Sequence, residues 1–227
     1  MGNFTQKQSR ITVSLCTYTF AQKLNIQVMT DKEQFIHALS STGRRGVESV
    51  LANLNALGFF TAPASSVFHL NGPGGLLTHS LNVYKEAMAI REKQAELCPE
   101  VMELIPADSV AIAALLHDVC KADIYKEAVK SRKLEDGSWE KYAGYDVDYS
   151  SFPLGHGEKS VIQLLRWGLE MTDAEICAIR WHMGPWDLAF QSPESKSNIS
   201  TAKGQYPLIS LITAADGLAS FLMERKQ

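Results

Sequence analysis

The run of apolar residues from 110 to 116 restricts the fold more than any other part of the chain. It contains only Val, Ala, Ile and Leu, so a helix built from it has no polar face. A helix that is apolar on every side has to lie at the centre of a protein, covered by other elements. Asp108 is expected to cap this helix, which we predict to run from Ser109 to about Cys120.

Helical signals recur along the chain from residue 30 onward. Thr30 followed by Glu33, and Thr172 followed by Glu175, have the spacing of capping boxes that open helices. Apolar residues at every third or fourth position predict further helices over about 47–57, 77–88, 156–169 and 207–222. The polar segments 59–75 and 187–206 are expected to be loops.

Residues 125–146 have a different pattern. Asp136-Gly137 separates two short runs, 125–134 and 138–145, which is typical of a β-hairpin. Helices joined by loops, with one such insertion, predict an all-α class: a helical bundle with a small β-hairpin near 125–146. The length of 227 residues suits one domain over 30–227, preceded by an extension over 1–29 to which the pattern assigns no structure.

Charge and composition exclude several classes of protein. The net charge of −3 gives no general basic field, so it does not indicate RNA or DNA as a partner, although a local basic patch would still allow one. No apolar run approaches the roughly 20 residues of a membrane span, so we expect a cytoplasmic chain without a membrane partner. The cysteines form no CxxC pair, which argues against a zinc ribbon or a disulfide framework; they are Cys16, Cys98, Cys120 and Cys177.

A histidine and an aspartate end the central apolar helix. An unpaired buried carboxylate costs several kcal/mol, so Asp118 needs a cation or hydrogen-bond donors. Taken alone, His117-Asp118 has an ordinary explanation in an ion pair between Asp118 and Lys121 beside a core histidine. The pair therefore does not indicate chemistry by itself.

Further residues of the same two types lie on or at the ends of the other predicted helices. A single helical histidine or aspartate usually has a structural role. Four histidines and two aspartates, each beside an apolar helix, favour convergence on metal in the core of a bundle. The candidate metal ligands are His79, His117, Asp118, His156, His182 and Asp216.

This ligand set predicts metal chemistry at phosphorus. Imidazole and carboxylate suit divalent Fe, Mn, Ni, Co or Zn, and the set exceeds the four positions of one tetrahedral site, so we expect two ions bridged by a carboxylate. Two ions roughly 3.5–4 Å apart can clamp an in-line displacement and form hydroxide at neutral pH. Lys121 would support the negative charge that develops on a phosphoryl oxygen. Asp118 and Lys121 are therefore the candidate catalytic residues.

The order of these residues resembles the H…HD…H…H…D pattern of the HD-domain phosphohydrolase superfamily. The stretches GGLLTHS at 74–80 and ALLHDVCK at 114–121 are similar to the HD domain of bacterial 3′→5′ exoribonucleases. The resemblance covers about residues 60–222. The first 60 residues show no OB-fold pattern, unlike those exoribonucleases, which argues against an RNA substrate.

The resemblance implies a role for each ligand and for Lys121. It implies an HD-type helical bundle in which Asp118 bridges two metals and Lys121 binds the substrate phosphate or stabilises the leaving group. The first metal would be held by His79, His117, Asp118 and Asp216, and the second by His156 and His182 together with Asp118.

Two other residues are candidate substrate contacts. His69 lies in a predicted loop ten residues before His79, where a local hydrogen bond is the more common explanation. Arg180 precedes His182 and could reach a phosphate, or could lie on the solvated end of its helix.

The predicted function is hydrolysis of a phosphate mono- or diester by metal-activated hydroxide. The expected substrate is a small phosphorylated molecule, a nucleotide or a relative of one. Two alternatives stay open on the residues alone. The same ligands suit an HD-domain di-iron oxygenase that cleaves a carbon bond, and they suit a non-catalytic nucleotide- or metal-binding module. The pattern leaves the oligomeric state open.

Overall fold

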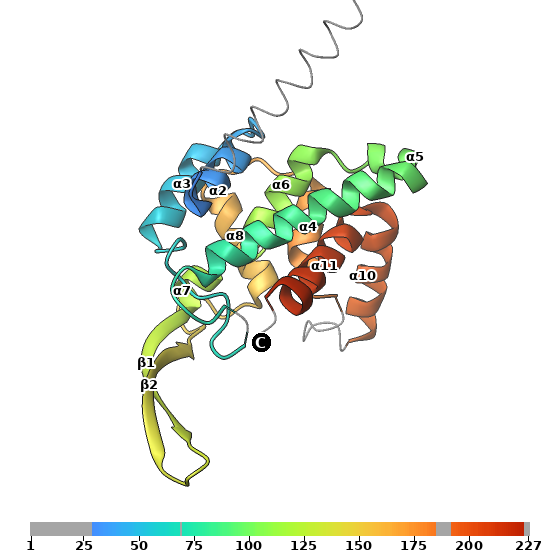
Figure 1. Ribbon diagram of the computed structural model, residues 1–227. Coiled ribbons are helices and arrows are strands. Elements are labelled where there is room, and N and C mark those ends of the chain that lie inside the picture. The colour runs from blue at the N-terminus through green and yellow to red at the C-terminus, as the bar shows by residue number, and fades with distance from the viewer. Residues whose placement is uncertain (1–28, 69, 185–191, 225–227) are drawn as a thin grey trace, which may run out of the picture.

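The chain is mostly helical with one two-stranded sheet, as the sequence predicts (Figure 1). The computed structural model describes residues 29–68, 70–184 and 192–224, so nearly all of the expected extension over 1–29 lies outside the described residues. The helices are α2 (Asp31–Ser40), α3 (Val47–Ala56), α4 (Gly75–Leu97), α5 (Pro99–Glu103), α6 (Ala107–Leu116), α7 (Lys121–Ile124), α8 (His156–Arg166), α9 (Asp173–Trp181), α10 (Pro193–Gln205) and α11 (Leu208–Leu218). The strands are β1 (Tyr125–Lys133) and β2 (Trp139–Val147), and a π-helical segment, η3 (Ala219–Met223), continues α11.

Helix α6 is the central element, as its composition predicts. Every residue from Ser109 to Leu116 is buried. The helix packs against α2, α4, α9 and α11, so its apolar surface is covered from several sides. It ends at Leu116 rather than near residue 120, and a turn at residues 117–120 connects it to α7.

The expected cap of α6 is wrong. Asp108 makes no capping hydrogen bond, and Pro106 occupies the N-cap position. The Asp108 carboxylate instead accepts a hydrogen bond from Arg44 at 2.8 Å. The Asp108 carboxylate therefore pairs with the guanidinium of Arg44, which is distant in the sequence, and does not cap the helix as its local position predicted.

Both capping boxes are confirmed. At α2, the Thr30 hydroxyl accepts from the Glu33 amide at 3.3 Å, and the Glu33 carboxylate accepts from the Thr30 amide at 2.8 Å. The same pair of bonds opens α9, at 3.3 Å and 2.9 Å between Thr172 and Glu175. These reciprocal bonds satisfy backbone amides that a helix start leaves without intrahelical partners.

The predicted hairpin is also confirmed. Strands β1 and β2 pair antiparallel from Tyr125↔Val147 at the base to Lys133↔Trp139 near the turn. Gly137 in that turn has φ of 85°, a conformation that favours glycine. The hairpin projects away from the helical body as a narrow arm (Figure 1).

The expected loop over 187–206 is wrong for most of its length. Residues 193–205 form α10, and residues 185–191 lie outside the described part of the chain. The Ser192 hydroxyl caps this helix by accepting from the Ser195 amide, and Pro193 occupies its first turn. Both are helix-start signals that the polar composition obscured.

No single helix among the described residues is long and apolar enough to cross a membrane. Helix α10 and the segment Leu208–Met223 meet the length and composition requirement only when taken together, and they are bent by 104° at the break between them.

Candidate metal centre

Asp118 lies at the middle of a cluster that contains all four of the predicted histidines. Its Oδ2 is 3.2 Å from His117 Nε2 and 3.7 Å from His79 Nε2. Its Oδ1 is 3.6 Å from His182 Nε2 and 4.0 Å from His156 Nε2. The two carboxylate oxygens therefore face different pairs of imidazoles.

Asp216 completes the cluster from α11. Its Oδ1 is 3.4 Å from His79 Nε2, and the Nε2 atoms of His79 and His117 are 3.2 Å apart. Three overlapping groups have potential ligand atoms within 4.8 Å of one another: His79, His117 and Asp118; His117, His182 and Asp216; and Asp118, His156 and His182. The structure thus brings together six side chains from five separate positions along the chain, His117 and Asp118 being adjacent.

His117 and His182 are held by the same local device. Each is the C-cap residue of its helix, α6 or α9. The Nδ1 of His117 bonds the Ala114 carbonyl at 2.8 Å, and the Nδ1 of His182 bonds the Ile179 carbonyl at 2.7 Å. A carbonyl can only accept, so Nδ1 of each ring carries a proton and Nε2 faces the cluster. The helix end that leaves carbonyls without partners thereby fixes the tautomer of both rings.

His79 is anchored by a carboxylate that the sequence analysis missed. Its Nδ1 lies 3.1 Å from each carboxylate oxygen of Glu224, at the end of η3. Asn82, one turn along α4, donates to the same carboxylate at 3.0 Å. A signal was present, because Glu224 follows Asp216 by eight residues, about two helical turns on the same face. It was obscured by the polar sequence that follows the last apolar stripe.

His156 reaches the cluster through a close approach of two helices. It is the first residue of α8, and its ring centroid lies 5.0 Å from that of His182. A Cβ at Gly157 would lie 2.5 Å from the Arg180 carbonyl oxygen of α9. Only glycine allows α8 to approach α9 this closely, so Gly157 helps to place His156 beside His182.

Lys121 lies against the shared carboxylate. Its Nζ is 2.5 Å from Asp118 Oδ2, and the side chain is partly exposed. Burial disfavours the positive charge of the Lys121 ammonium and so lowers its pKa. The negative charge of Asp118 has the larger effect, and the pKa of Lys121 is raised. The ion pair that the sequence suggested as an ordinary explanation is thus present, within a larger cluster.

The pKa values of the cluster follow from burial and from charge. Burial opposes ionisation of Asp118, but the charges of Lys121 and His117 lower the pKa of its carboxyl well below the usual range. Burial lowers the pKa of His182 to about 3, so this ring is neutral at pH 7.

The pKa of His79 shifts in the other direction. Burial lowers it, but hydrogen bonds to Asp216 and Glu224 have the larger effect and raise the pKa of His79 to about 9. At pH 7 the His182 imidazole is therefore neutral and the Asp118 carboxylate is ionised, which are the forms that bind metal, whereas His79 would lose a proton on binding it.

Two buried atoms in the cluster show that a cation fits. Asp118 Oδ1 and His182 Nε2 have no hydrogen-bond partner among the described residues. Both side chains are at most 2% exposed. These two atoms lie 3.6 Å apart, and each offers an electron pair to which no described N–H or O–H group donates. The cluster could bind metal ions, which would satisfy both atoms.

Of the two candidate substrate contacts, the structure describes only Arg180. His69 falls outside the described residues. The Arg180 guanidinium is 2.5 Å from the Glu158 carboxylate and lies over the Trp181 ring, 3.9 Å from its centroid. Arg180 therefore contributes to the contact between α8 and α9, and the structure does not place it among the cluster residues.

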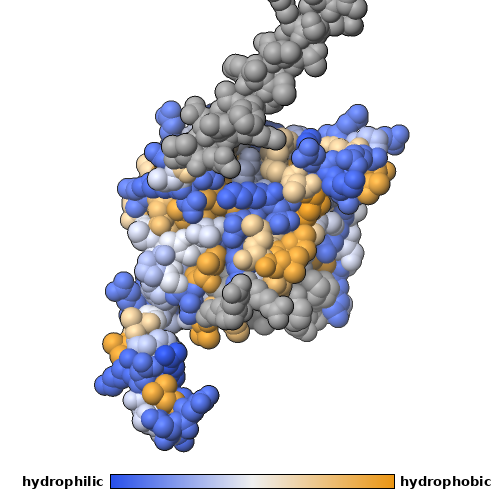
Figure 2. Space-filling view, in the orientation of Figure 1, coloured by the Kyte–Doolittle hydropathy of each residue, from blue (hydrophilic) through white to orange (hydrophobic). Residues whose placement is uncertain are grey.

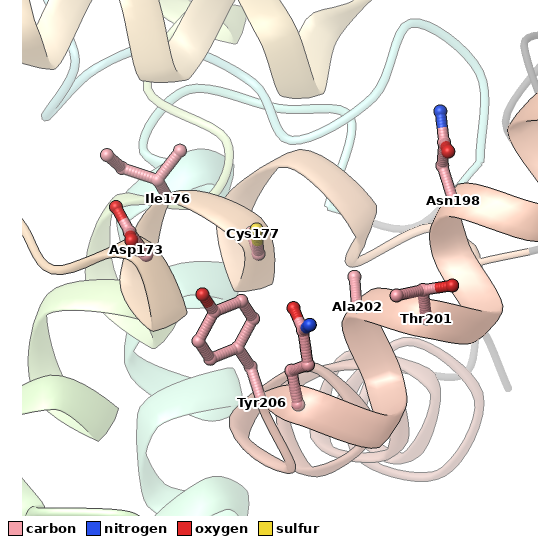
Figure 3. Close-up of a pocket in the computed structure, with 8 residues that line it drawn as sticks. Asp173, Ile176, Cys177, Asn198, Thr201, Ala202 and Tyr206 are labelled. Atoms are coloured by element: carbon pink, nitrogen blue, oxygen red, sulfur yellow. The ribbon is translucent and has the colours of Figure 1, made fainter.

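A pocket of about 330 Å³ lies apart from the cluster, between α9 and α10 (Figure 3). It contains none of the predicted ligands. Its lining residues are Asp173, Ile176, Cys177, Asn198, Thr201, Ala202, Gln205 and Tyr206.

Comparison with known proteins finds one similarity of note. No family model matches the chain, and no solved structure matches it. Over 89 residues the chain is 35% identical to a dihydroneopterin 2′,3′-cyclic phosphate phosphodiesterase from Methanocaldococcus jannaschii. The shared stretch is 39% of this chain and 32% of the relative, so the chain aligns with about a third of the relative's length.

Proposed function

We propose that this chain is a metal-dependent hydrolase of phosphate esters and a member of the HD-domain superfamily. The observation that carries the proposal is the cluster of four histidines and Asp216 around Asp118, in which Asp118 Oδ1 and His182 Nε2 are buried without a hydrogen-bond partner in the described part of the chain. A phosphodiesterase among the chain's relatives supports phosphorus as the reacting atom. We infer a small nucleotide-like phosphodiester as the substrate class.

The ligand assignment in this proposal divides the cluster between two divalent ions. Asp118 would bridge them, because its two oxygens face different imidazole pairs. Bound ions would supply Lewis acidity toward a phosphoryl oxygen and a hydroxide at neutral pH. The first site would use His79, His117, Asp118 and Asp216, and the second would use Asp118, His156 and His182.

The chain's own residues would orient the substrate and hold charge. Lys121 would bind a phosphoryl oxygen, since its ammonium lies beside Asp118 and its side chain reaches solvent. His156 is the most exposed of the histidine ligands, at 23%, so substrate would enter from its side of the cluster. Glu224 would hold His79 with Nε2 toward the metal, as carboxylates commonly do for metal-binding histidines.

The test is a panel of phosphomonoesters, linear diesters and 2′,3′-cyclic diesters, with Mn²⁺, Ni²⁺, Co²⁺ or Fe²⁺ supplied. We expect the wild-type protein to cleave a diester. The rate of cleavage should fall at least ~10²-fold in Asp118→Ala and in His117→Ala. His37→Ala is the matched control, because His37 is an exposed histidine outside the cluster. Circular dichroism checks that each variant remains folded.

Two results would overturn the proposal. One is a folded, metal-loaded protein that cleaves no phosphoester in the panel. The other is bound iron with oxygen-dependent cleavage of a carbon bond, which would favour a di-iron oxygenase.

A further inference from the structure

The two faces of the β1–β2 hairpin have different side chains. Because strand residues alternate between faces, the register assigns each cross-strand pair to one side. One side, the paired face, consists of Lys126, Ala128, Lys130, Arg132, Glu140, Tyr142, Gly144 and Asp146. The other, the open face, consists of Tyr125, Glu127, Val129, Ser131, Lys133, Trp139, Lys141, Ala143, Tyr145 and Val147.

The charged groups of the paired face have partners within the chain, and Lys126 donates a hydrogen bond to the Asp123 carbonyl at 2.9 Å. Arg132 forms an ion pair with Glu140 at 2.6 Å, and its guanidinium lies 5.5 Å from the centre of the Tyr142 ring. Lys130 forms an ion pair with Asp146 across the strands. This face therefore needs no external partner for these charged groups.

At the base of the open face, Tyr125 donates a hydrogen bond to the Ala64 carbonyl at 3.4 Å and its ring packs against Tyr145, so both are half-buried. Farther along the arm, the apolar and charged groups of this face are uncovered. Val129 is 74% exposed and Trp139 is 69% exposed. Within the described part of the chain, Glu127, Lys133 and Lys141 form no ion pair. Figure 2 shows apolar residues on the projecting arm among its polar ones. A two-stranded hairpin is marginally stable in water without a further layer, so a covering partner is expected here.

We propose that the open face binds the open face of a second copy of this chain, with the two arms stacked in opposite directions. The charges along β1 carry this assignment. Glu127 lies near the base of the arm and Lys133 near its turn. A two-fold axis across the middle of the strand, near residue 130, places Glu127 of each copy opposite Lys133 of the other.

The same axis also matches the aromatic residues. Tyr145 is the cross-strand partner of Glu127, and Trp139 is the cross-strand partner of Lys133. The axis that joins the charges therefore places Tyr145 of one copy opposite Trp139 of the other. Packed sheets lie about 10 Å apart, which leaves room for one layer of such side chains from each copy.

The direction of stacking follows from the shape of the molecule. The arm projects from one side of the helical body (Figure 1). Arms stacked in opposite directions keep the two bodies at opposite ends, whereas arms stacked in the same direction would bring the bodies together. The resulting contact is isologous and closes after two copies. Each arm offers only two strands of 9 residues, so we expect a contact smaller than a standard interface of about 1,600 Å² and a dimer with a micromolar dissociation constant.

Sedimentation velocity over roughly 1–100 µM, a range that brackets micromolar affinity, tests the proposal through the charge pair. Glu127→Lys alone and Lys133→Glu alone should each weaken the dimer about tenfold, because symmetry makes two like-charge contacts. The double variant Glu127→Lys/Lys133→Glu should return to near wild-type affinity. Glu127 and Lys133 are six residues apart on one strand, so this rescue requires contact between copies.

Matched aromatic variants test which face is used. Trp139→Ser removes an open-face ring and should weaken the dimer, whereas Tyr142→Ser removes a paired-face ring and should not. A wild-type protein that stays monomeric over the whole range would overturn the proposal. So would equal effects of the two serine variants, or a double charge variant no tighter than the single ones.

Discussion

At the scale of single residues, the candidate metal centre is built from ring orientation. His117 and His182 use the carbonyl three residues earlier to fix Nδ1, which directs Nε2 into the cluster. His79 sits within a helix, where that carbonyl is already occupied, and uses Glu224 instead. These hydrogen bonds already hold the imidazole rings in place, so binding a metal would cost less conformational entropy.

Glu224 provides a prediction at this scale. Glu224→Ala should weaken metal binding about 10- to 100-fold, because His79 loses the acceptor that fixes its tautomer. Glu224→Gln keeps an acceptor oxygen and should fall between the wild type and the alanine variant. Competition with a chelating dye measures the affinity. If Glu224→Ala bound metal as tightly as the wild type, Glu224 would have no positioning role.

At the scale of elements, one arginine connects three segments. Arg44, in the loop between α2 and α3, donates two hydrogen bonds of 2.8 Å to Glu175 of α9 and one of 2.8 Å to Asp108 of α6. Ser109 also donates to Glu175 at 2.6 Å. Glu175 is fully buried, so its charge depends on these partners. The network fixes the start of α6 and the start of α9, two helices whose C-cap residues are His117 and His182.

Arg44→Ala should therefore destabilise the fold strongly. We expect a loss of about 3–5 kcal/mol, because a buried carboxylate loses its charged partner. Arg45→Ala is the matched control, since Arg45 is the exposed neighbour and should change stability by less than about 0.5 kcal/mol. Urea unfolding followed by circular dichroism measures both. Similar losses in the two variants would show that the network does not carry this stability.

At the scale of the whole molecule, the cluster joins most of the bundle. Its six side chains come from α4, the end of α6, α8, the end of α9 and α11. A metal bound there would connect these helices in the native state and not in the unfolded chain. Metal binding should therefore stabilise the whole fold and not only the site.

Thermal unfolding measures this coupling. Metal at 100 times its dissociation constant should add about 2.7 kcal/mol, which raises the Tm by roughly 5–11 °C for a chain of this size. Asp118→Ala should abolish the shift, and His37→Ala should retain it. An equal shift in Asp118→Ala would place the bound metal elsewhere on the protein.

The sequence by itself determined the features that depend on local patterns. The apolar run before His117 predicted a buried central helix, the spacing of Thr172 and Glu175 predicted a capping box, and Asp136-Gly137 predicted a hairpin. All are confirmed, because helix periodicity, capping and turn conformation are set by residues close together in the chain.

Only the tertiary structure decided which distant groups meet. The pairing of Asp108 with Arg44, the contact of Glu224 with His79 and the place of Arg180 beside Glu158 have no local signal that selects one partner over another. The sequence could identify the central helix that ends in His117-Asp118. That Asp118 directs its two oxygens at imidazoles from four helices depends on packing between segments far apart in the chain, which no local spacing encodes.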